Sequence, residues 1–571
     1  MTKRHFINYF QKKINLKKKS KIIFSTEYLL KSFSPNQLKS FNYEYLENLN
    51  HVYNKNKKKL FILKKVRQYR NFLKNKLNKI HNTKFKNKEW GLLLDYYLII
   101  SIISINRKIE SYKKIKDKKI SIKVISGNFF FSDTKSIYDQ LAHGIKLNQY
   151  IDYIIFDKLK FKNLNIRKVK FEDKSYEKQK KTILFNKFFL NIIIKIFKPS
   201  LIFNGYFGII KSIKIMCLSK FKILFLKDNF LNSPVKLNYK NIQLREMLDI
   251  PEKDFFDKVF NVYNKNIFPN SFLESFDYFY YSNKNLSKDV KNVGTAILLH
   301  ISDTFKFLLL NIKKRGGKII TFQHGGLFGM RKFSPEDYIN NNYADLKFFW
   351  ADKKGIGATY FDKVTKINDK KSGILFLPSL TLFQEMTENL KECNHLYLNK
   401  YWKLYEFINI DKKKLIKFKL FNHPRSKILK NLWLRKTNKS IKFEYRNYKG
   451  NINKKFKLTV IDNFSTPLFE LIYNSYPFII INDSKQNEFT NEFKKILNHL
   501  KSLNILFDSE KKAADFINKN YNDIDSWWNK IIKKKKFKII KKSLFSIKEF
   551  NNSKFVNSFA YQLAKGDNKI S

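Results

Sequence analysis

Short runs of β-branched and aromatic residues alternate with helix-like segments along most of this chain. This alternation limits the possible folds more than any other feature, because it predicts βα units and parallel sheets. The runs are IKVIS (122–126), YIIF (153–156), LIFN (201–204), KILFL (222–226), KIITF (318–322), LKFFW (346–350), GILFLP (373–378), IKFKLFNHP (416–424), KLTVIDN (457–463), PFIIIND (477–483) and NILFD (504–508). We therefore predict an α/β protein with two successive sheets.

The length of the chain also points to more than one domain. A chain of 571 residues is longer than one hydrophobic core usually supports. The first part opens with the apolar run KIIFS (21–25) and continues with Lys-rich segments of helical period, so we predict a helical N-terminal region at 1–120. A polar stretch that ends in glycine separates the two sheets. It places one Rossmann-like domain at 121–365 and a second, followed by terminal helices, at 366–571.

The net charge has two explanations. Lys and Arg total 114 against 48 Asp and Glu, which gives +66 at pH 7. Such an excess suggests a polyanionic partner, either nucleic acid or an anionic membrane surface. However, the excess is spread along the whole chain together with abundant Asn, Ile and Phe, which is typical of an AT-rich coding sequence. Both explanations stay open at this point.

Targeting features favour a cytoplasmic protein. Cys217 and Cys393 lie far apart and have no metal-ligand spacing, which fits a reducing compartment. The basic stretch at 1–13 lacks the apolar core of a signal peptide. The apolar run LLLDYYLIISIISI (92–105) is shorter than the roughly 20 residues that span a bilayer, and it contains Asp95. We expect a buried helix there, with peripheral membrane attachment through Lys-rich faces as the remaining membrane option.

Ligands in open α/β sheets bind at the carboxyl ends of strands, so the residues that follow each apolar run are candidate site residues. KIITF leads into Gln323, His324, Gly325 and Gly326. Glycines there permit positive φ and let a ligand approach the backbone, while a histidine at a domain edge suits a general base. The alternative is a glycine-rich turn with a hydrogen-bonded histidine.

A second candidate loop follows the strand at 416–421. His423 and Arg425 flank a proline that fixes the turn, so both side chains could face one cleft and bind phosphate. Ordinary surface side chains would give the same pattern.

A third candidate loop follows KLTVI. Thr466 and Pro467 have the pattern of an N-cap and a first helical residue, so a helix should begin at the strand tip and offer its N–H groups to an anion. The hydroxyls of Ser465 and Thr466 could complete this site, and Glu470, one turn later, could accept hydrogen bonds from a ribose. The alternative is an ordinary capped helix with an exposed glutamate.

Together the three loops show a family resemblance. QHGG, HPR and DNFSTPLFE, in this order, resemble GT-B-type transferases of bacterial surface carbohydrate, including CDP-glycerol glycerophosphotransferases and capsule or Kdo transferases. With the stretch LNKIHNTKFKNKEWGLLLDYYL (77–98), the chain is most similar to transferases encoded in O-antigen regions. The resemblance covers roughly residues 20–540. In the N-terminal part this chain departs from the family pattern, retaining Trp90 and Arg107, so the resemblance assigns no acceptor residues there.

The resemblance implies a GT-B-like fold, in which two Rossmann-like domains face a cleft. It implies that His324 is the general base, that His423, Arg425, Ser465 and Thr466 bind the donor phosphates, and that Glu470 contacts the ribose. It further implies an inverting transfer of a sugar or related group from a nucleotide-activated donor, without metal or other cofactor. No DxD motif follows a strand in this sequence.

The expected partners are therefore a nucleotide-sugar donor and a lipid-linked or saccharide acceptor of O-antigen or capsule synthesis. A peripheral position on the inner membrane is compatible with this activity. Two other functions stay open: a nucleic-acid-binding protein that uses the +66 charge, and a catalytically inactive carbohydrate-binding relative. A nucleic-acid binder should gather its cations on one face among aromatic side chains.

Overall fold

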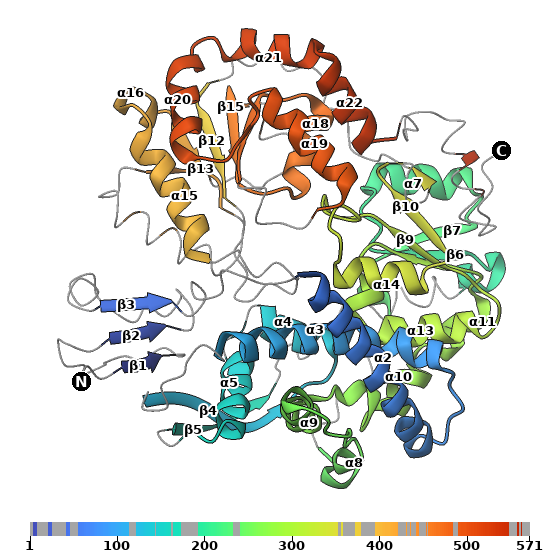
Figure 1. Cartoon of the computed structure of the whole chain (residues 1–571). Coiled ribbons are helices and arrows are strands. Elements are labelled where there is room, and N and C mark those ends of the chain that lie inside the picture. Colours follow the sequence, from blue (N-terminus) through green and yellow to red (C-terminus); the bar gives the residue numbers. More distant parts are fainter. Residues whose placement is uncertain are drawn as a thin grey trace.

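The architecture is known for most of the chain. The computed structural model describes residues 4–7, 21–24, 42–45, 55–112, 121–142, 144, 146–161, 164–172, 192–231, 240–351, 356–357, 372–378, 394–420, 430, 434, 441–444, 453, 455–482, 489–546, 557–558 and 561. Figure 1 shows them arranged in three parts: the first sheet and its helices lie below, the second sheet lies to the right, and the third sheet with its helices lies above.

Three parallel sheets form the framework of the molecule. The first has the order β3-β2-β1-β4-β5, the second β11-β10-β9-β8-β6-β7 and the third β14-β13-β12-β15-β16-β17. The first comprises β1 (Arg4–Ile7), β2 (Lys21–Phe24), β3 (Asn42–Tyr45), β4 (Ser121–Phe130) and β5 (Leu164–Glu172). The second comprises β6 (Ser200–Phe203), β7 (Ile223–Leu226), β8 (Val293–Thr295), β9 (Ile319–Phe322), β10 (Leu346–Phe349) and β11 (Ile356–Gly357). The third comprises β12 (Ile374–Leu377), β13 (Ile416–Phe418), β14 (Lys442–Phe443), β15 (Leu458–Ile461), β16 (Phe478–Ile481) and β17 (Leu506–Phe507).

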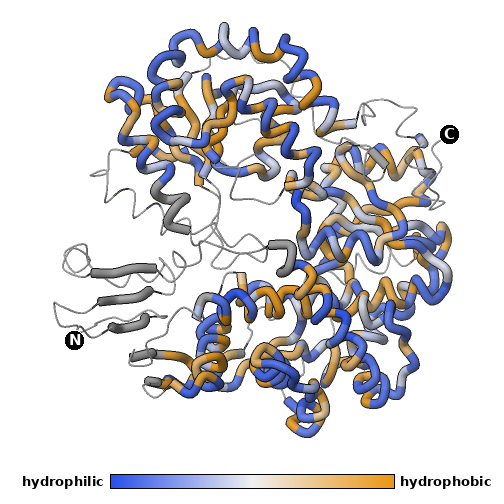
Figure 2. Tube along the Cα trace, viewed as in Figure 1, coloured by the Kyte–Doolittle hydropathy of each residue, from blue (hydrophilic) through white to orange (hydrophobic). Residues whose placement is uncertain are grey.

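Helices connect and cover the strands, as expected for parallel sheets. They are α2 (Lys55–Ile80), α3 (Asn87–Tyr112), α4 (Thr134–Ala142), α5 (Lys146–Lys158), α7 (Ile209–Leu218), α8 (Ile242–Glu246), α9 (Phe255–Ile267), α10 (Phe276–Ser282), α11 (Lys284–Asp289), α12 (Leu298–Ile301), α13 (Asp303–Lys313), α14 (Pro335–Tyr343), α15 (Asn394–Phe407), α16 (Ile410–Lys413), α18 (Thr466–Asn474), α19 (Asn491–Ser502), α20 (Glu510–Asn520), α21 (Ile524–Lys533) and α22 (Lys535–Leu544). Figure 2 shows hydrophilic and hydrophobic residues alternating along many of them, as expected for helices that bury one face.

The α/β class and most of the predicted strands are confirmed. Strands form at ten of the eleven apolar runs, namely in β4, β6, β7, β9, β10, β12, β13, β15, β16 and β17. The exception is YIIF (153–156), which lies inside α5. A four-residue apolar run does not distinguish a strand from a buried helical segment, and here the neighbouring residues continue the helix.

Two further expectations are corrected. The N-terminal region is not entirely helical, because β1, β2 and β3 lie within 1–120 and β1 pairs with β4 across residue 120. The strands of 121–365 belong to two sheets, so the described chain has three sheets instead of two. The change from the second to the third sheet falls between β11 and β12. The domain limits given above stay predictions.

The predicted buried helix at 92–105 is confirmed as part of α3, whose residues from Trp90 to Ile105 are all buried. Asp95 is accommodated because Arg70 Nη1 donates to its Oδ2 at 2.7 Å and the Tyr343 hydroxyl donates to the same oxygen at 2.6 Å. Burial nevertheless raises the pKa of Asp95 to about 6. Within the described ranges, no helix combines the length and apolarity needed to cross a bilayer.

One hydrophobic core joins the second and third sheets. It includes Phe322 and Trp350 from the second sheet and Phe469 from α18, which follows β15. The rings of Trp350 and Phe469 lie 5.3 Å apart. At the rim of this core the Thr490 N–H donates to the Met330 carbonyl at 2.9 Å. The loop after β9 is therefore packed against the third sheet.

The helix α13 is anchored by a buried polar network at its N-terminal end. The Asp303 carboxylate accepts hydrogen bonds from the backbone N–H and hydroxyl of Thr134 at 2.8 and 2.9 Å, and from the Ser271 hydroxyl at 2.6 Å. Lys306 Nζ forms an ion pair with the same carboxylate at 2.9 Å. Because these groups are buried and paired, the position of α13 relative to α4 is well defined.

Candidate functional site

Three aromatic side chains meet at the carboxyl edge of the second sheet, where β6, β8 and β9 lie side by side. Tyr206 follows β6, His300 lies in α12 just after β8, and His324 follows β9. The ring centroid of His324 lies 6.2 Å from that of Tyr206 and 6.0 Å from that of His300, with interplanar angles of 23° and 20°. The edge of a parallel sheet is where ligands bind in α/β proteins, so this cluster is the candidate active site.

Burial favours the neutral form of the His324 imidazole. Its side chain is half-buried, and its Nδ1 has no hydrogen-bond partner among the described residues. The nearby Ala296 carbonyl favours a proton on the ring nitrogen that faces it, and a proton on Nε2 leaves the lone pair on Nδ1. Burial lowers the pKa of His324 to about 4 despite this carbonyl. The Phe328 ring packs edge-on at 4.8 Å. The neutral ring can accept a proton at Nδ1.

His300 extends the cluster inward. It is buried, its Nδ1 also has no partner within the described part of the chain, and burial together with the nearby His324 and Lys306 lowers its pKa well below the usual value. The Tyr96 ring of α3 lies 5.2 Å away, and the Tyr96 hydroxyl donates to Glu336 Oε1 at 3.4 Å. Burial raises the pKa of Glu336. A line of titratable groups thus leads from the loop after β9 to α3 and α14.

The side chain of Gln323 fixes the loop that carries His324. Its Oε1 accepts a hydrogen bond from the Trp350 N–H at 2.9 Å, and its Nε2 donates to the Gly325 carbonyl at 2.9 Å. Its backbone N–H donates to the Phe348 carbonyl at 2.8 Å. The first residue of the QHGG motif is therefore a positioning residue that ties the turn to the end of β10.

The two glycines of this motif act differently from the expectation. Neither has a positive φ, so the left-handed conformation that glycine permits is not used at either position. A Cβ added to Gly326 would lie 2.3 Å from the Phe469 ring and 2.9 Å from the Ser465 carbonyl carbon, whereas one added to Gly325 would meet only Phe328 at 3.8 Å. Gly326 is needed because α18 packs directly on the backbone. The backbone of Gly325 stays open to a ligand.

The third candidate loop also differs in detail. Ser465, not Thr466, is the N-cap of α18, and Thr466 and Pro467 form its first turn. The Ser465 hydroxyl does not cap the helix; it donates to Asn463 Oδ1 at 2.7 Å. Glu470 follows one turn later on a half-buried face with Thr466.

The structure brings two of the three candidate loops together. The contact between Gly326 and the Ser465 backbone places the end of β9 beside the end of β15, although the strands belong to different sheets. His324, Ser465 and Thr466 therefore belong to one region. His423 and Arg425 lie outside the described residues, so their predicted phosphate-binding role stays a prediction.

Tyr206 and His300 were not singled out from the sequence. Tyr206 follows the predicted strand LIFN directly, and the strand-end rule would have found it. Its backbone φ of 58° and that of Asn204, at 50°, lie in the left-handed region, which is uncommon for a tyrosine and typical of functional loops. His300 follows a three-residue strand, VGT, which has no clear sequence signal.

Across the described residues there is no group of three or more His, Cys, Asp or Glu side chains placed to hold a metal ion.

The profile of the LIC12162 family transferases matches residues 10–545 of this sequence. The chain belongs to the LIC12162 family of transferases. No curated protein matches the sequence significantly.

Several solved glycosyltransferase structures have a limited similarity to this transferase. SsfS6, a glycosyltransferase from Streptomyces sp. SF2575, is 9% identical with a TM-score of 0.28, over 60% of this chain and 96% of that chain. MurG from Acinetobacter baumannii is 7% identical with a TM-score of 0.29, over 78% of this chain and 99% of that chain. The glycosyltransferase of kitacinnamycin is also 7% identical, with a TM-score of 0.29.

Proposed function

We propose that this transferase is a GT-B-type glycosyltransferase that moves a sugar or related group from a nucleotide-activated donor to a saccharide acceptor of surface polysaccharide, such as O-antigen or capsule. One observation carries the proposal: the loop after β9 presents His324, whose Nδ1 has no partner among the described residues, and its Gly326 packs against the start of α18 from the neighbouring sheet. This arrangement supplies a base on one side and an anion-binding helix terminus on the other.

The proposed reaction is a single displacement. His324 Nδ1 takes the proton from an acceptor hydroxyl, and that oxygen forms a bond to the anomeric carbon. The bond from this carbon to the donor phosphate oxygen breaks, and the nucleotide leaves with the electron pair, so the configuration inverts. The nearby Ala296 carbonyl favours the protonated ring and so stabilises the resulting imidazolium. Because Nδ1 is buried, a neighbouring side chain has to move before the acceptor can reach it.

The donor side of the proposal is built on α18. Its first turn offers the Thr466 N–H and hydroxyl, whereas Pro467 has no N–H and the Leu468 N–H already donates to the Ser465 carbonyl at 3.0 Å. This leaves one backbone donor, which is too little to hold a diphosphate alone. The side chains of His423 and Arg425 supply the remaining contacts in this proposal, and Glu470 contacts the ribose. Such charge neutralisation by side chains lets transfer proceed without a metal.

Nucleotide binding tests the proposed function. A thermal-shift screen with CMP, CDP, UDP, GDP and dTDP should show stabilisation by one base, of about 2.7 kcal/mol at a free concentration 100 times Kd. His423→Ala should weaken that binding by about 1.5–3 kcal/mol, the range for a hydrogen bond to a charged group. His499→Ala, which removes an imidazole from α19, is the control. Failure of all five nucleotides to shift the melting temperature would contradict the proposal.

A peripheral membrane position is part of the proposal, and α7 supports it. Ile209 and Ile210 are 81% and 84% exposed, and Ile215 is the only buried residue of this ten-residue helix. Ile213 is also exposed, and Lys211 and Lys214 lie next to these isoleucines in the sequence. Monomeric soluble proteins rarely expose such an apolar surface, and interleaved lysines favour an anionic lipid surface. The helix begins three residues after Tyr206, so docking through it would hold the candidate active site near the bilayer.

Vesicle binding tests this part separately. Burial of one isoleucine is worth about 1.5–3 kcal/mol, so the double variant Ile209→Asn, Ile210→Asn should bind vesicles containing phosphatidylglycerol at least tenfold more weakly than the wild type. Ile410→Asn, at an exposed isoleucine of α16, is the matched control and should bind normally. Equal binding by all three proteins would show that α7 does not contact the membrane.

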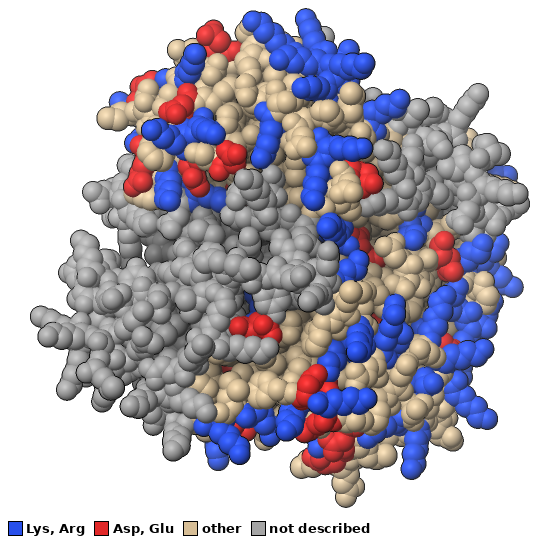
Figure 3. Space-filling view, viewed as in Figure 1, with Lys and Arg blue, Asp and Glu red and all other residues tan. Residues whose placement is uncertain are grey.

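The nucleic-acid alternative is less well supported. On the face shown in Figure 3, Lys and Arg side chains are distributed over the upper, right and lower parts and do not form one stripe. Salt-resistant, sequence-specific DNA binding would favour this alternative, whereas binding that disappears between about 50 and 200 mM salt would be non-specific.

A further inference from the structure

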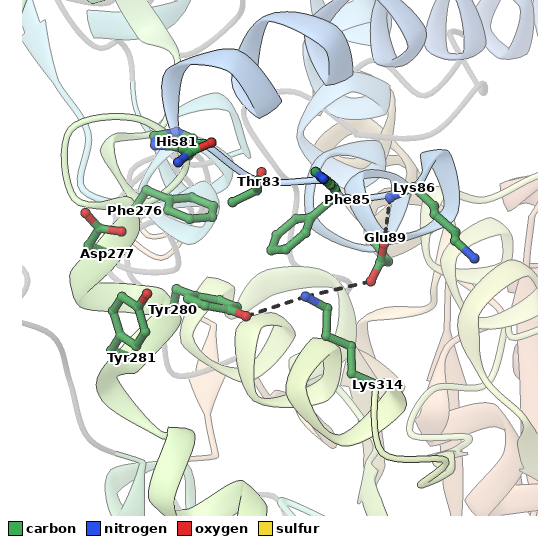
Figure 4. Close-up of a pocket in the computed structure, with 12 residues that line it drawn as sticks. His81, Thr83, Phe85, Lys86, Glu89, Phe276, Asp277, Tyr280, Tyr281 and Lys314 are labelled. Carbon is green, nitrogen blue, oxygen red and sulfur yellow. Dashed lines mark hydrogen bonds and ion pairs between the residues drawn. The ribbon is translucent and has the colours of Figure 1, made fainter.

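A pocket of about 450 Å³ lies on the side of the molecule formed by the N-terminal helices. Its rim is the turn between α2 and α3, HNTKFK (81–86), together with Glu89 in the first turn of α3. Its other walls are α10 and the residue after α13, Lys314. This turn belongs to the family-like motif at 77–98, to which the proposed reaction gives no role. Figure 4 shows aromatic and charged side chains from these three elements facing one space.

Asn78 organises the rim of the pocket. Its Oδ1 accepts hydrogen bonds from the Thr83 hydroxyl at 2.8 Å, from the Phe85 N–H at 3.1 Å and from Trp90 Nε1 at 2.8 Å. Its Nδ2 donates to the Phe85 carbonyl at 3.0 Å. The turn is therefore held in one conformation before any ligand arrives, which lowers the entropic cost of binding.

Aromatic rings form the walls of this pocket. The His81 ring stacks on Phe276 at 4.0 Å and 10°, and the rings of Tyr280 and Tyr281 lie 5.0 Å apart and nearly perpendicular. Tyr281 remains 54% exposed, although Lys284 lies 5.1 Å from its ring centroid. Such rings offer flat apolar faces with a negative quadrupole, on which polarised C–H groups can rest.

The polar groups of the pocket include both donors and acceptors. Lys314 Nζ is fixed 4.1 Å from the Phe85 ring centroid and 4.0 Å from Glu89 Oε1. His81 Nε2 hydrogen-bonds the Phe272 carbonyl at 3.0 Å, so its Nδ1 is an acceptor, and burial lowers the pKa of the ring. The carboxylates of Glu89 and Asp277 disfavour a strongly anionic ligand.

We propose that this pocket binds a pyranose unit of the saccharide acceptor, at a distance from the reacting hydroxyl. A pyranose matches both features of the lining, since its C–H face rests on aromatic rings and its hydroxyls both donate and accept. The pocket lies at the C-terminal end of α13, whereas His300, whose ring lies 6.0 Å from that of His324, directly precedes the N-terminal end of this helix. The helix axis from Ser302 to Lys314 is roughly 18 Å long at 1.5 Å per residue. The occupant is therefore a part of the acceptor other than the sugar that reacts at His324. The identity of this ligand as the acceptor rests on the proposed function; pyranose binding itself does not.

Saturation-transfer NMR tests the proposal without donor or turnover. The probes are the methyl glycosides of glucose, galactose, mannose, N-acetylglucosamine and rhamnose, and sorbitol is the acyclic control. At least one glycoside should receive saturation while sorbitol does not. In Tyr281→Ala its Kd should rise by roughly three- to tenfold, the loss of one aromatic contact. Tyr278→Ala is the matched control, because Tyr278 is 46% exposed on the same helix and does not line the pocket.

Each result of this experiment supports or contradicts pyranose binding. The proposal would be overturned if none of the five glycosides received saturation, or if sorbitol received as much as they do. It would also be overturned if Tyr281→Ala and Tyr278→Ala raised the Kd of the glycoside equally. Unchanged melting temperatures of both variants confirm folding. Nucleotide binding by Tyr281→Ala should equal that of the wild type. A negative glycoside result would therefore not contradict nucleotide binding, and a negative nucleotide screen would not contradict glycoside binding.

Discussion

Replacing His324 with alanine is expected to lower turnover by about 10²–10⁴-fold, because positioned proton transfer typically contributes that factor. Donor affinity should hardly change, since the imidazole faces the acceptor side in the proposed reaction. Product formation from the nucleotide donor identified by the thermal-shift screen is the measurement. A folded variant that binds nucleotide and turns over at the wild-type rate would show that His324 is only a turn residue.

The pH dependence gives an independent check. Only the neutral ring accepts a proton, and burial holds the pKa of His324 at about 4, so the acid limb of the wild-type rate profile should lie near pH 4 instead of near 6.5. The same shift affects folding. Between pH 6.5 and 4 the unfolded chain binds a proton at this histidine and the folded chain does not, so the wild type loses stability as the pH falls through this window. The stability of His324→Ala should fall less steeply there, whatever its activity.

The substitution Gly326→Ala is expected to destabilise the fold by about 1–3 kcal/mol or more, the usual cost of overpacking a core. The new methyl group would lie 2.3 Å from the fully buried Phe469 ring and close to the Ser465 backbone, neither of which can easily move. Gly325→Ala, one residue away, should be nearly neutral because its methyl group would meet only Phe328. Urea unfolding of both variants measures the difference. Equal midpoints would mean that α18 can shift away from the loop.

The sequence predicted those parts of the fold that have a local signal. KIITF and LIFN form strands because each is a short run of β-branched or aromatic residues, which is typical of a strand buried inside a parallel sheet. The run YIIF has the same local signal, but its neighbours extend it into a helix of 13 residues. The strand VGT is too short to be recognised. It forms because Val293 and Thr295 pair with the adjacent strand β9.

At the candidate site, too, only the features with a local sequence signal were predicted. His324 was predicted because it follows a recognisable strand, whereas His300 follows one that is not recognisable. The role of Gly326 depends on Phe469, a residue of another sheet, and no local pattern reports a tertiary neighbour. The N-cap lies one residue before the predicted one because Ser465 and Thr466 are both residue types that are favoured at that position.

The shared core of the second and third sheets has a consequence for how the molecule unfolds. Domains that meet through a small polar interface melt separately and rotate freely about their linker. Here the same apolar cluster contains residues of both sheets, and the ring contact between Trp350 and Phe469 crosses from one to the other. Neither sheet can lose its packing without exposing part of the other, so the two behave as one cooperative unit. The bond between Thr490 and Met330 adds to this coupling, and a hinge that opens the whole space between the sheets would have to break it.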